Sequence, residues 1–160
     1  MSFARSPAVR STPMELREQI ERAFERTPAP QGRLVETLFD DEGVSDYFRG
    51  RTWRGHAVKD LRYHEVALSF FTPEAFRYFL PAFMLASIDD PEAADVIPDG
   101  ILFHLSAPDD PHQWGRVVQF EPAECDAIAA FLWWLADQYN AGQIEKALEG
   151  LERAKQLHGG

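Results

Sequence analysis

The sequence predicts a compact, mainly α-helical single domain, and three observations lead to that fold class. Apolar residues recur at the three- and four-residue spacing of helices along most of the chain. Thr-Pro pairs at 12–13 and 72–73 are typical of helix starts. A length of 160 residues, with 45% hydrophobic and 26% charged residues, suits one core. We therefore expect a flexible leader at 1–11 and one helical domain at 12–158.

The first helix is expected to begin after Thr12. Thr12 can cap it, Pro13 fits its first turn, and Glu15 lies three residues after Thr12, as in a capping box. Its apolar face consists of Leu16, Ile20, Ala23 and Phe24. The segment "TPAPQG" at 27–32 ends it, because two prolines and a glycine cannot continue a helix.

The next segment, "RLVETLFDDEGVSDYFRG" at 33–50, contains two short apolar groups. They are Leu34, Val35, Leu38 and Phe39, followed by Val44, Tyr47 and Phe48. We expect one or two short helices here, closed by Gly50 as a C-terminal cap.

The stretch "FTPEAFRYFLPAFMLASIDD" at 71–90 predicts the central core helix. Phe76, Phe79, Leu80, Phe83, Met84 and Ile88 recur at helical spacing after Thr72 and Pro73. Tyr78, Ala82 and Leu85 widen the apolar stripe, so burial on several sides is expected. Pro81 should kink or restart the helix. The eleven uncharged residues between Arg77 and Asp89 are too few to cross a bilayer, which takes about 20.

The last third of the chain is expected to combine a small hairpin with two helices. "ILFHL" at 101–105 and "RVVQF" at 116–120 have the composition of strands, which leaves one small β-hairpin open. From Pro122 a helix should place Cys125, Ile128, Phe131, Leu132 and Leu135 inward. A final helix is expected at 143–158.

Three motifs together resemble a bacterial family of domains of unknown function: "YFRGRTW", the run from "FTPEAFRYFLPAF" to "DP", and "FEPAECDAIAAFLWWL". The matching positions are Gly50, Arg51, Trp53, Phe76, Tyr78, Leu80, Pro81, Phe83, Asp90, Pro91, Phe131, Leu132 and Trp134, within the run 75–83 and around it. The resemblance covers about 34–136, and the helix at 143–158 extends beyond it. It implies no activity or cofactor, so we expect these residues to be structural.

No motif predicts a catalytic residue, a metal site or a cofactor. His64 and Glu65 lack the second histidine that a zinc-protease helix needs. The acidic run 89–95 lacks the alternating order of a calcium loop. Cys125 is expected to face inward with a raised pKa, and His104 to be a half-exposed strand residue. The sequence therefore gives no support for an enzymatic function, but it does not exclude one.

The charge is unevenly distributed along the chain. The net charge is -10, yet 48–64 carries five cations against one acid, a local +4 that leaves -14 elsewhere. Basic residues beside Trp53 and Tyr63 could bind nucleic acid. We prefer the simpler interpretation, in which they balance the acidic runs at 40–42 and 89–95. In that case Trp53 packs inward, and Arg51 and Arg54 reach acidic neighbours.

By elimination, we expect a cytosolic protein-interaction domain with a basic protein partner. An acidic immunity or antitoxin-like inhibitor is a concrete version of it. The alternative is a small enzyme or ligand-binding domain with an aromatic-lined pocket, and a nucleic-acid-binding module using 48–64 comes third. The single cysteine and the lack of a signal-like segment fit the cytoplasm. Candidate partner-binding residues are Asp40, Asp41, Glu42, Asp89, Asp90, Glu92 and Asp95.

Overall fold

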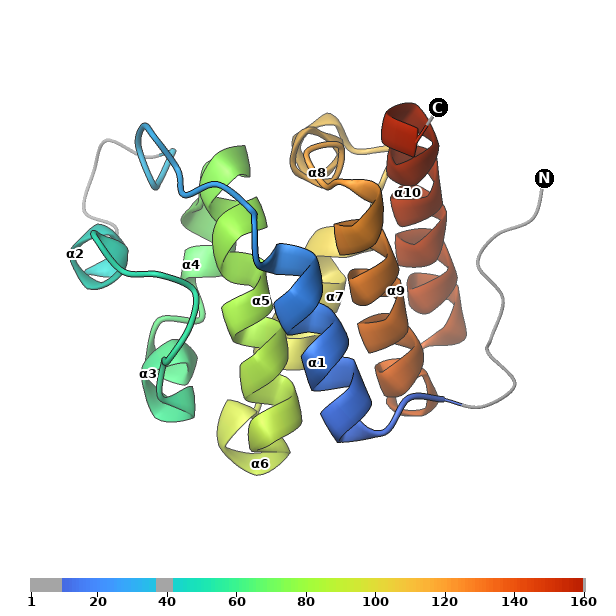
Figure 1. Ribbon diagram of the computed structural model, residues 1–160, viewed down its shortest axis with the longest axis horizontal. Helices are drawn as coiled ribbons and strands as arrows, with labels where there is room; N and C mark the ends of the chain where they lie inside the picture. Colours follow the sequence, from blue (N-terminus) through green and yellow to red (C-terminus); the bar gives the residue numbers. More distant parts are fainter. Residues whose placement is uncertain (1–9, 37–41, 160) are drawn as a thin grey trace.

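The computed structural model describes residues 10–36 and 42–159, and it confirms the mainly α-helical fold (Figure 1). The helices are α1 Pro13–Phe24, α2 Val44–Phe48, α3 Val58–Tyr63, α4 Ala67–Phe70, α5 Pro73–Asp89, α6 Pro91–Ala94, α7 Ile97–Leu105, α8 Pro111–Val117, α9 Pro122–Leu135, the 3-10 helix η1 Ala136–Gln138, and α10 Ala141–Gly159. The described residues contain no sheet, only an isolated antiparallel bridge between Val35 and Phe71. Residues 1–9 of the expected leader lie outside the described part.

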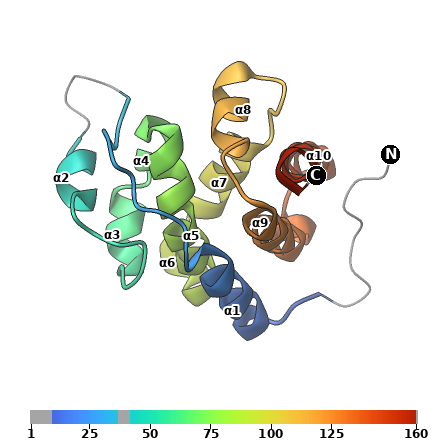
Figure 2. The ribbon, with the colours of Figure 1, turned by 45° about the horizontal axis from the view of Figure 1, so that its top comes forward.

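Helix α5 is the centre of the domain and packs against α1, α3, α6, α7 and α8 (Figures 1 and 2). The Thr72 hydroxyl caps it by accepting a hydrogen bond from the amide of Ala75, the third residue of the helix, as the sequence predicted. From Ala75 to Ile88 every residue except Arg77 is buried, which confirms burial on several sides. The helix continues through Pro81 without restarting, and the expected kink stays a prediction.

Helices α1, α9 and α10 form one side of the core. The Thr12 hydroxyl accepts from the Glu15 amide at 3.1 Å, and the Glu15 carboxylate accepts from the Thr12 amide at 2.9 Å. This confirms the capping box, and α1 then packs against α5 and α9. Figure 2 shows α9 between α1 and α10.

A buried ionic cluster joins these layers. The carboxylate of Glu124 is 2% exposed and accepts two hydrogen bonds from Arg77, at 2.9 and 3.1 Å. The Thr27 hydroxyl donates to the same carboxylate, and the Glu121 amide donates to it at 2.7 Å. Because both carboxylate oxygens are bonded, the cluster links α5, α9 and the turn after α1 without a bare buried charge.

The predicted hairpin is wrong, because neither of its segments forms a strand. Residues 101–105 form the second half of α7, and 116–120 begin at the end of α8. Pro98 fits the first turn of α7, and Ile97, Ile101 and Leu105 recur every four residues on its buried side. Packing of this stripe against α5 outweighs the β-propensity of the single residues.

The segment before α2 also differs from expectation. Val35 lies in the bridge to Phe71, and the Glu36 amide donates to the Phe70 carbonyl at 2.9 Å, so no helix forms at 34–36. The rest of that expected helix, with Leu38 and Phe39, lies outside the described residues. Gly50 follows α2 with φ of +73°, which confirms the predicted left-handed cap.

A fully buried arginine, which sequence patterns did not indicate, holds the end of α4. The Arg116 guanidinium donates to the carbonyls of Leu68, Ser69 and Phe71 at 2.7, 3.0 and 2.7 Å. Its planar group also lies 4.8 Å from the centre of the Phe76 ring. Arg116 therefore satisfies the terminal carbonyls of a four-residue helix that could not stand alone.

Candidate binding site

An open cavity of about 490 Å³ lies over α7, and we call it the α7 cleft. Its chemically distinctive lining consists of Glu65, Ser69, Asp99, Phe103, His104 and Tyr139. Three regions supply these groups: the segment from the end of α3 through α4, helix α7, and the turn between η1 and α10. Ligand sites commonly have volumes of about 300 to 1,000 Å³, so the α7 cleft falls in that range.

The local structure of α7 explains how the cleft is formed. Asp99 and Phe103 are one helical turn apart and lie away from the buried stripe, and Phe103 is 62% exposed. Between them, Gly100 leaves room for Glu65, because a Cβ at this position would lie 3.1 Å from Glu65 Oε2. Burial, followed by the hydrogen bond to Asp99, raises the pKa of the Tyr139 hydroxyl. The Tyr139 hydroxyl and the Asp99 carboxylate therefore lie close to each other at the cleft.

The cleft contains a serine next to a histidine, but their properties do not favour catalysis. Ser69 Oγ lies 3.3 Å from His104 Nε2. Burial, and then the positive charge of Arg116, lower the pKa of His104 to about 4. A base with so low a pKa accepts a serine proton poorly at neutral pH. The pair is therefore a neutral hydrogen-bonding feature of the cleft wall, and His104 is buried rather than half-exposed as predicted.

Three of the acids predicted to bind a partner already have local roles around α6. Arg17 contacts both carboxylate oxygens of Asp89, at 2.6 and 2.7 Å. Asp90 caps α6 by accepting from a first-turn amide at 3.1 Å. Arg62 Nε donates a hydrogen bond to Asp95 Oδ2 at 3.0 Å. Of these contacts only the Arg62–Asp95 pair joins a cation of 48–64 to the acidic run, as expected, because Arg17 belongs to α1.

Together with Glu92, these acids form an exposed group at one end of α5, which we call the acidic end: Asp89, Asp90, Glu92 and Asp95. Figure 1 shows α6 at this end of the domain. Glu42 is exposed next to α2, which lies apart from α6 in both views (Figures 1 and 2). Asp40 and Asp41 lie outside the described residues. The structure thus brings together four of the seven predicted acids.

The basic stretch is largely engaged within the domain. Trp53 is 4% exposed, which confirms that it packs inward. Arg54 lies 4.1 Å from the centre of the Trp53 ring and 3.6 Å from Glu21, so it reaches an acid as expected. Arg51 instead stacks over Tyr47, at 4.4 Å from the ring centre, and donates to its carbonyl.

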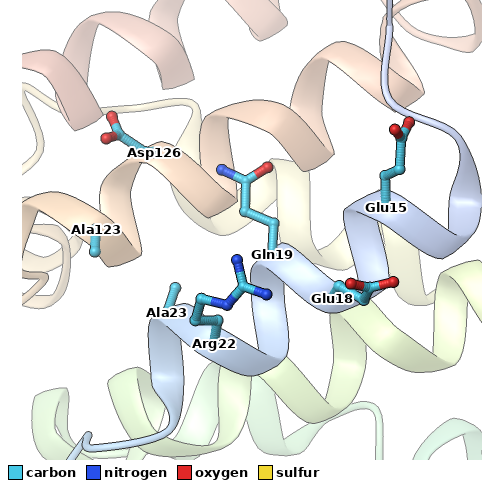
Figure 3. A pocket seen from close by; sticks show the side chains of 7 residues that line it. All are labelled: Glu15, Glu18, Gln19, Arg22, Ala23, Ala123 and Asp126. Carbon is cyan, nitrogen blue, oxygen red and sulfur yellow. The ribbon is translucent and has the colours of Figure 1, made fainter.

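A second hollow, of about 330 Å³, lies between α1 and α9 (Figure 3). Figure 3 shows Gln19 pointing from α1 into the space between the two helices, with Ala123 and Asp126 on α9. The groove is lined by Arg22 as well as by acidic residues such as Glu18. Its third acid, Asp126, already accepts a hydrogen bond from Lys155 at 2.8 Å. Charges of both signs and the short alanine side chains leave this groove without a preference for one ligand class.

Other chemistry is sparse in the described part of the chain. It contains no group of three or more histidine, cysteine or acidic residues placed to hold a metal ion. None of its helices is long and apolar enough to cross a membrane. Cys125 is buried, and burial raises the pKa of its thiol to about 12, as the sequence led us to expect.

The residues of the α7 cleft were absent from the sequence-predicted candidates, and the reason is the strand assignment at 101–105. If the helical period is extended from Ile97, then Phe103 falls on the side opposite Ile101 and Leu105. A large exposed aromatic residue beside Asp99 would then have been visible as a signal. Glu65 and Tyr139 line the cleft from segments far from α7 in the sequence. No local sequence pattern could have indicated that they lie there.

Several residues of the family resemblance are buried or half-buried. Those in α5, from Phe76 to Phe83, are buried, and Trp134 is half-buried on α9 with its ring 6.0 Å from that of Phe131. No curated protein and no solved structure matches the chain. A family of unknown function, DUF6714, matches residues 12–156, which includes α1 and most of α10 as well as the motifs. The chain therefore belongs to the DUF6714 family, whose function is unknown.

Proposed function

We propose that this domain is a cytoplasmic protein-interaction domain that binds a basic protein partner at the acidic end. The observation that carries the proposal is the grouping of four exposed carboxylates around α6, in a chain with a net charge of -10. A field of this sign attracts a basic surface and accelerates its encounter with the domain.

The ion pairs within the acidic end are compatible with a partner. The side chains of Asp89 and Asp95 remain 43% and 58% exposed beside their arginines. Exposed pairs of this kind contribute about 0 to 1 kcal/mol, so they do not hold the carboxylates against a competing cation. A carboxylate also has lone pairs for a second donor. A partner arginine or lysine can therefore share Asp89 and Asp95 with Arg17 and Arg62.

An immunity or antitoxin-like inhibitor is the specific form of this proposal. Proteins of that kind cover a basic partner, and the acidic end offers the complementary charge. The analogy sets the class of partner and no more than that. Nucleic acid is disfavoured as the partner, because Trp53 is buried and Arg54 and Arg62 are paired with acids.

The test is capture of the product of the neighbouring gene by the full chain, measured with the wild type and with Asp89→Asn, Glu92→Gln and Asp95→Asn combined. We expect the association rate to fall at least tenfold in the variant and to fall steeply with salt. Asparagine and glutamine keep the side-chain shape while removing three charges.

The matched control combines Glu25→Gln, Glu145→Gln and Glu149→Gln, which removes the same charge from α10 and from the end of α1. If the control slows association as much as the α6 variant, only net charge matters and the acidic end is not the binding surface. Capture that survives about 0.5 M salt, where the Debye length is only a few Å, would likewise contradict the proposal.

A further inference from the structure

We propose that the α7 cleft is a pocket for a cationic side chain, an arginine above all, inserted by the basic partner. This inference rests on the proposed function and names the group that the partner contributes. It is carried by three features of the cleft: its charge, its aromatic rings and its position beside the acidic end.

The charge of the lining selects a cation. Glu65 and Asp99 approach the cleft from two elements far apart in sequence, and no lysine or arginine belongs to its described lining. An anionic ligand would meet two carboxylates and no cation, which costs free energy. A guanidinium or ammonium group gains instead from both carboxylates, and a planar guanidinium can bond a carboxylate through two parallel donors.

The aromatic side chains of the cleft favour arginine over lysine as the cationic ligand. Phe103 on α7 is 62% exposed, and the partly buried Tyr139 also lines the cleft. Aromatic faces attract cations, and guanidinium stacks on them more often than ammonium. A partner arginine can thus place its aliphatic stem along Phe103 while its head reaches Asp99.

The other polar groups of the cleft are compatible with this ligand. Burial and the charge of Arg116 keep His104 neutral at physiological pH, so it adds no repelling charge. The Tyr139 hydroxyl near Asp99 can occupy only one lone pair of that carboxylate, and the others can accept from a guanidinium. The cleft therefore offers carboxylate acceptors and aromatic surface without a competing cation in its described lining.

The position of the cleft connects it with the acidic end. Asp95 directly precedes Val96, which lines the cleft at the start of α7. Helix α3, whose end leads into Glu65, packs against α6. A basic segment lying across α6 would thus reach the cleft without leaving the acidic surface.

The experiment uses three soluble probes with the full chain: the capped tripeptides Gly-Arg-Gly and Gly-Lys-Gly, and the same peptide with citrulline, the neutral isostere of arginine. Binding is followed by the amide NMR shifts of Gly100 and Phe103. We expect millimolar binding of the arginine peptide, and binding of the citrulline peptide about fivefold weaker or worse. Equal affinities for these two would overturn the inference, as would shifts confined to the groove between α1 and α9.

Matched variants test the residues. Asp99→Asn and Phe103→Ala should each weaken the arginine peptide about threefold or more. The controls are Glu149→Gln, which removes one charge outside the cleft, and Leu157→Ala, which truncates another exposed apolar side chain, 66% exposed. Both controls should bind the peptide as the wild type does. If a control weakens binding as much as its cleft counterpart, the cleft is not the site.

The inference and the proposed function can fail separately. Binding of the arginine peptide without capture of a basic protein partner retains the cationic pocket and contradicts the proposed function. Partner capture that depends on the α6 acids but is unchanged by Phe103→Ala retains the acidic end and overturns the pocket.

Discussion

Helices α5 and α7 lie against each other and are both rich in apolar residues, yet they use them differently. In α5 the rings of Phe76, Phe79 and Phe83 are all buried. In α7 the stripe through Ile101 faces α5, while Phe103 points away and is 62% exposed. The difference shows that α5 is covered by its neighbours from Ala75 to Ile88 on all sides but that of Arg77, whereas α7 has a buried side and an exposed side.

Helices α5 and α7 differ in how much of their surface other helices cover. A helix that is apolar all round needs partners on every side, and α5 contacts α1, α3, α6, α7 and α8. Helix α7 contacts α5, α4, α8 and α10, but the side that carries Asp99 and Phe103 remains open at the cleft. Phe103 contributes little to the core because it is exposed, and the proposed pocket uses its ring for binding.

The largest predicted effect separates the two helices directly. Phe79→Ala should lower the free energy of unfolding by about 3 to 5 kcal/mol, because Phe79 is 1% exposed and a cavity would remain. Phe103→Ala should change it by less than about 0.5 kcal/mol. Urea denaturation of both variants measures the difference. Similar losses in the two would mean that Phe103 packs within the core and that α7 has no open side.

A second effect tests the buried Arg116, which donates to the carbonyls at the end of α4. Arg116→Met should cost about 3 kcal/mol, because three carbonyls at the end of α4 lose their donors while the volume is nearly kept. Arg62→Met is the control, since its pair with Asp95 is exposed and should contribute less than about 1 kcal/mol. A stable Arg116→Met variant would show that water can replace the guanidinium there.

The third effect concerns the wall of the cleft and depends on pH. The pKa of His104 is about 4 in the folded protein and 6.5 in the unfolded chain, so the unfolded state binds more protons as the pH falls. The stabilisation from His104 is complete above about pH 6.5 and is lost progressively down to about pH 4.

Between pH 7 and pH 5 the wild type should therefore lose about 2 kcal/mol more than His104→Gln. Comparing the two pH profiles removes the contributions of the other titrating groups, which the variants share. Urea denaturation at both pH values gives the difference. Parallel profiles would mean that His104 is solvated in the folded protein and that the cleft wall is not as closed as its burial indicates.

Much of the α5 side of this comparison could be predicted from the sequence. The Thr72 cap, the buried phenylalanines and the capping box at Thr12 all follow from rules that act within a few residues. The inward Trp53 and the buried Cys125 followed from the same local reasoning. Local sequence signals are enough to predict burial where a segment is covered by neighbouring helices, whichever helices these are.

The α7 side could not be predicted in the same way. The run at 101–105 suits a strand by composition, and only its packing against α5 decides for a helix. Arg116 is another such case, because its three acceptors are carbonyls more than forty residues away. The cleft combines Glu65, Asp99 and Tyr139, which only the tertiary structure brings together.

The smallest predicted effect concerns Gly100, at the floor of the cleft. Gly100→Ala should gain about 0.5 to 1 kcal/mol from the better helix propensity of alanine. Against this gain, the new Cβ would lie 3.1 Å from Glu65 Oε2 and 3.4 Å from Leu68 Cδ1, so the Glu65 carboxylate must shift by a few tenths of an ångström. A half-exposed side chain can move, and we expect a net change within about 0.5 kcal/mol.

The control for this small effect is Gly150→Ala in α10, where the new Cβ would lie 2.9 Å from Cβ of Pro108. A proline ring is rigid, so this variant should lose about 1 to 3 kcal/mol in thermal and urea denaturation. The contrast tests whether the open side of α7 is free to adjust while the covered side of α10 is not. If Gly100→Ala loses as much as Gly150→Ala, Glu65 is held rigidly over α7 and the cleft is a fixed part of the core rather than an adjustable binding surface.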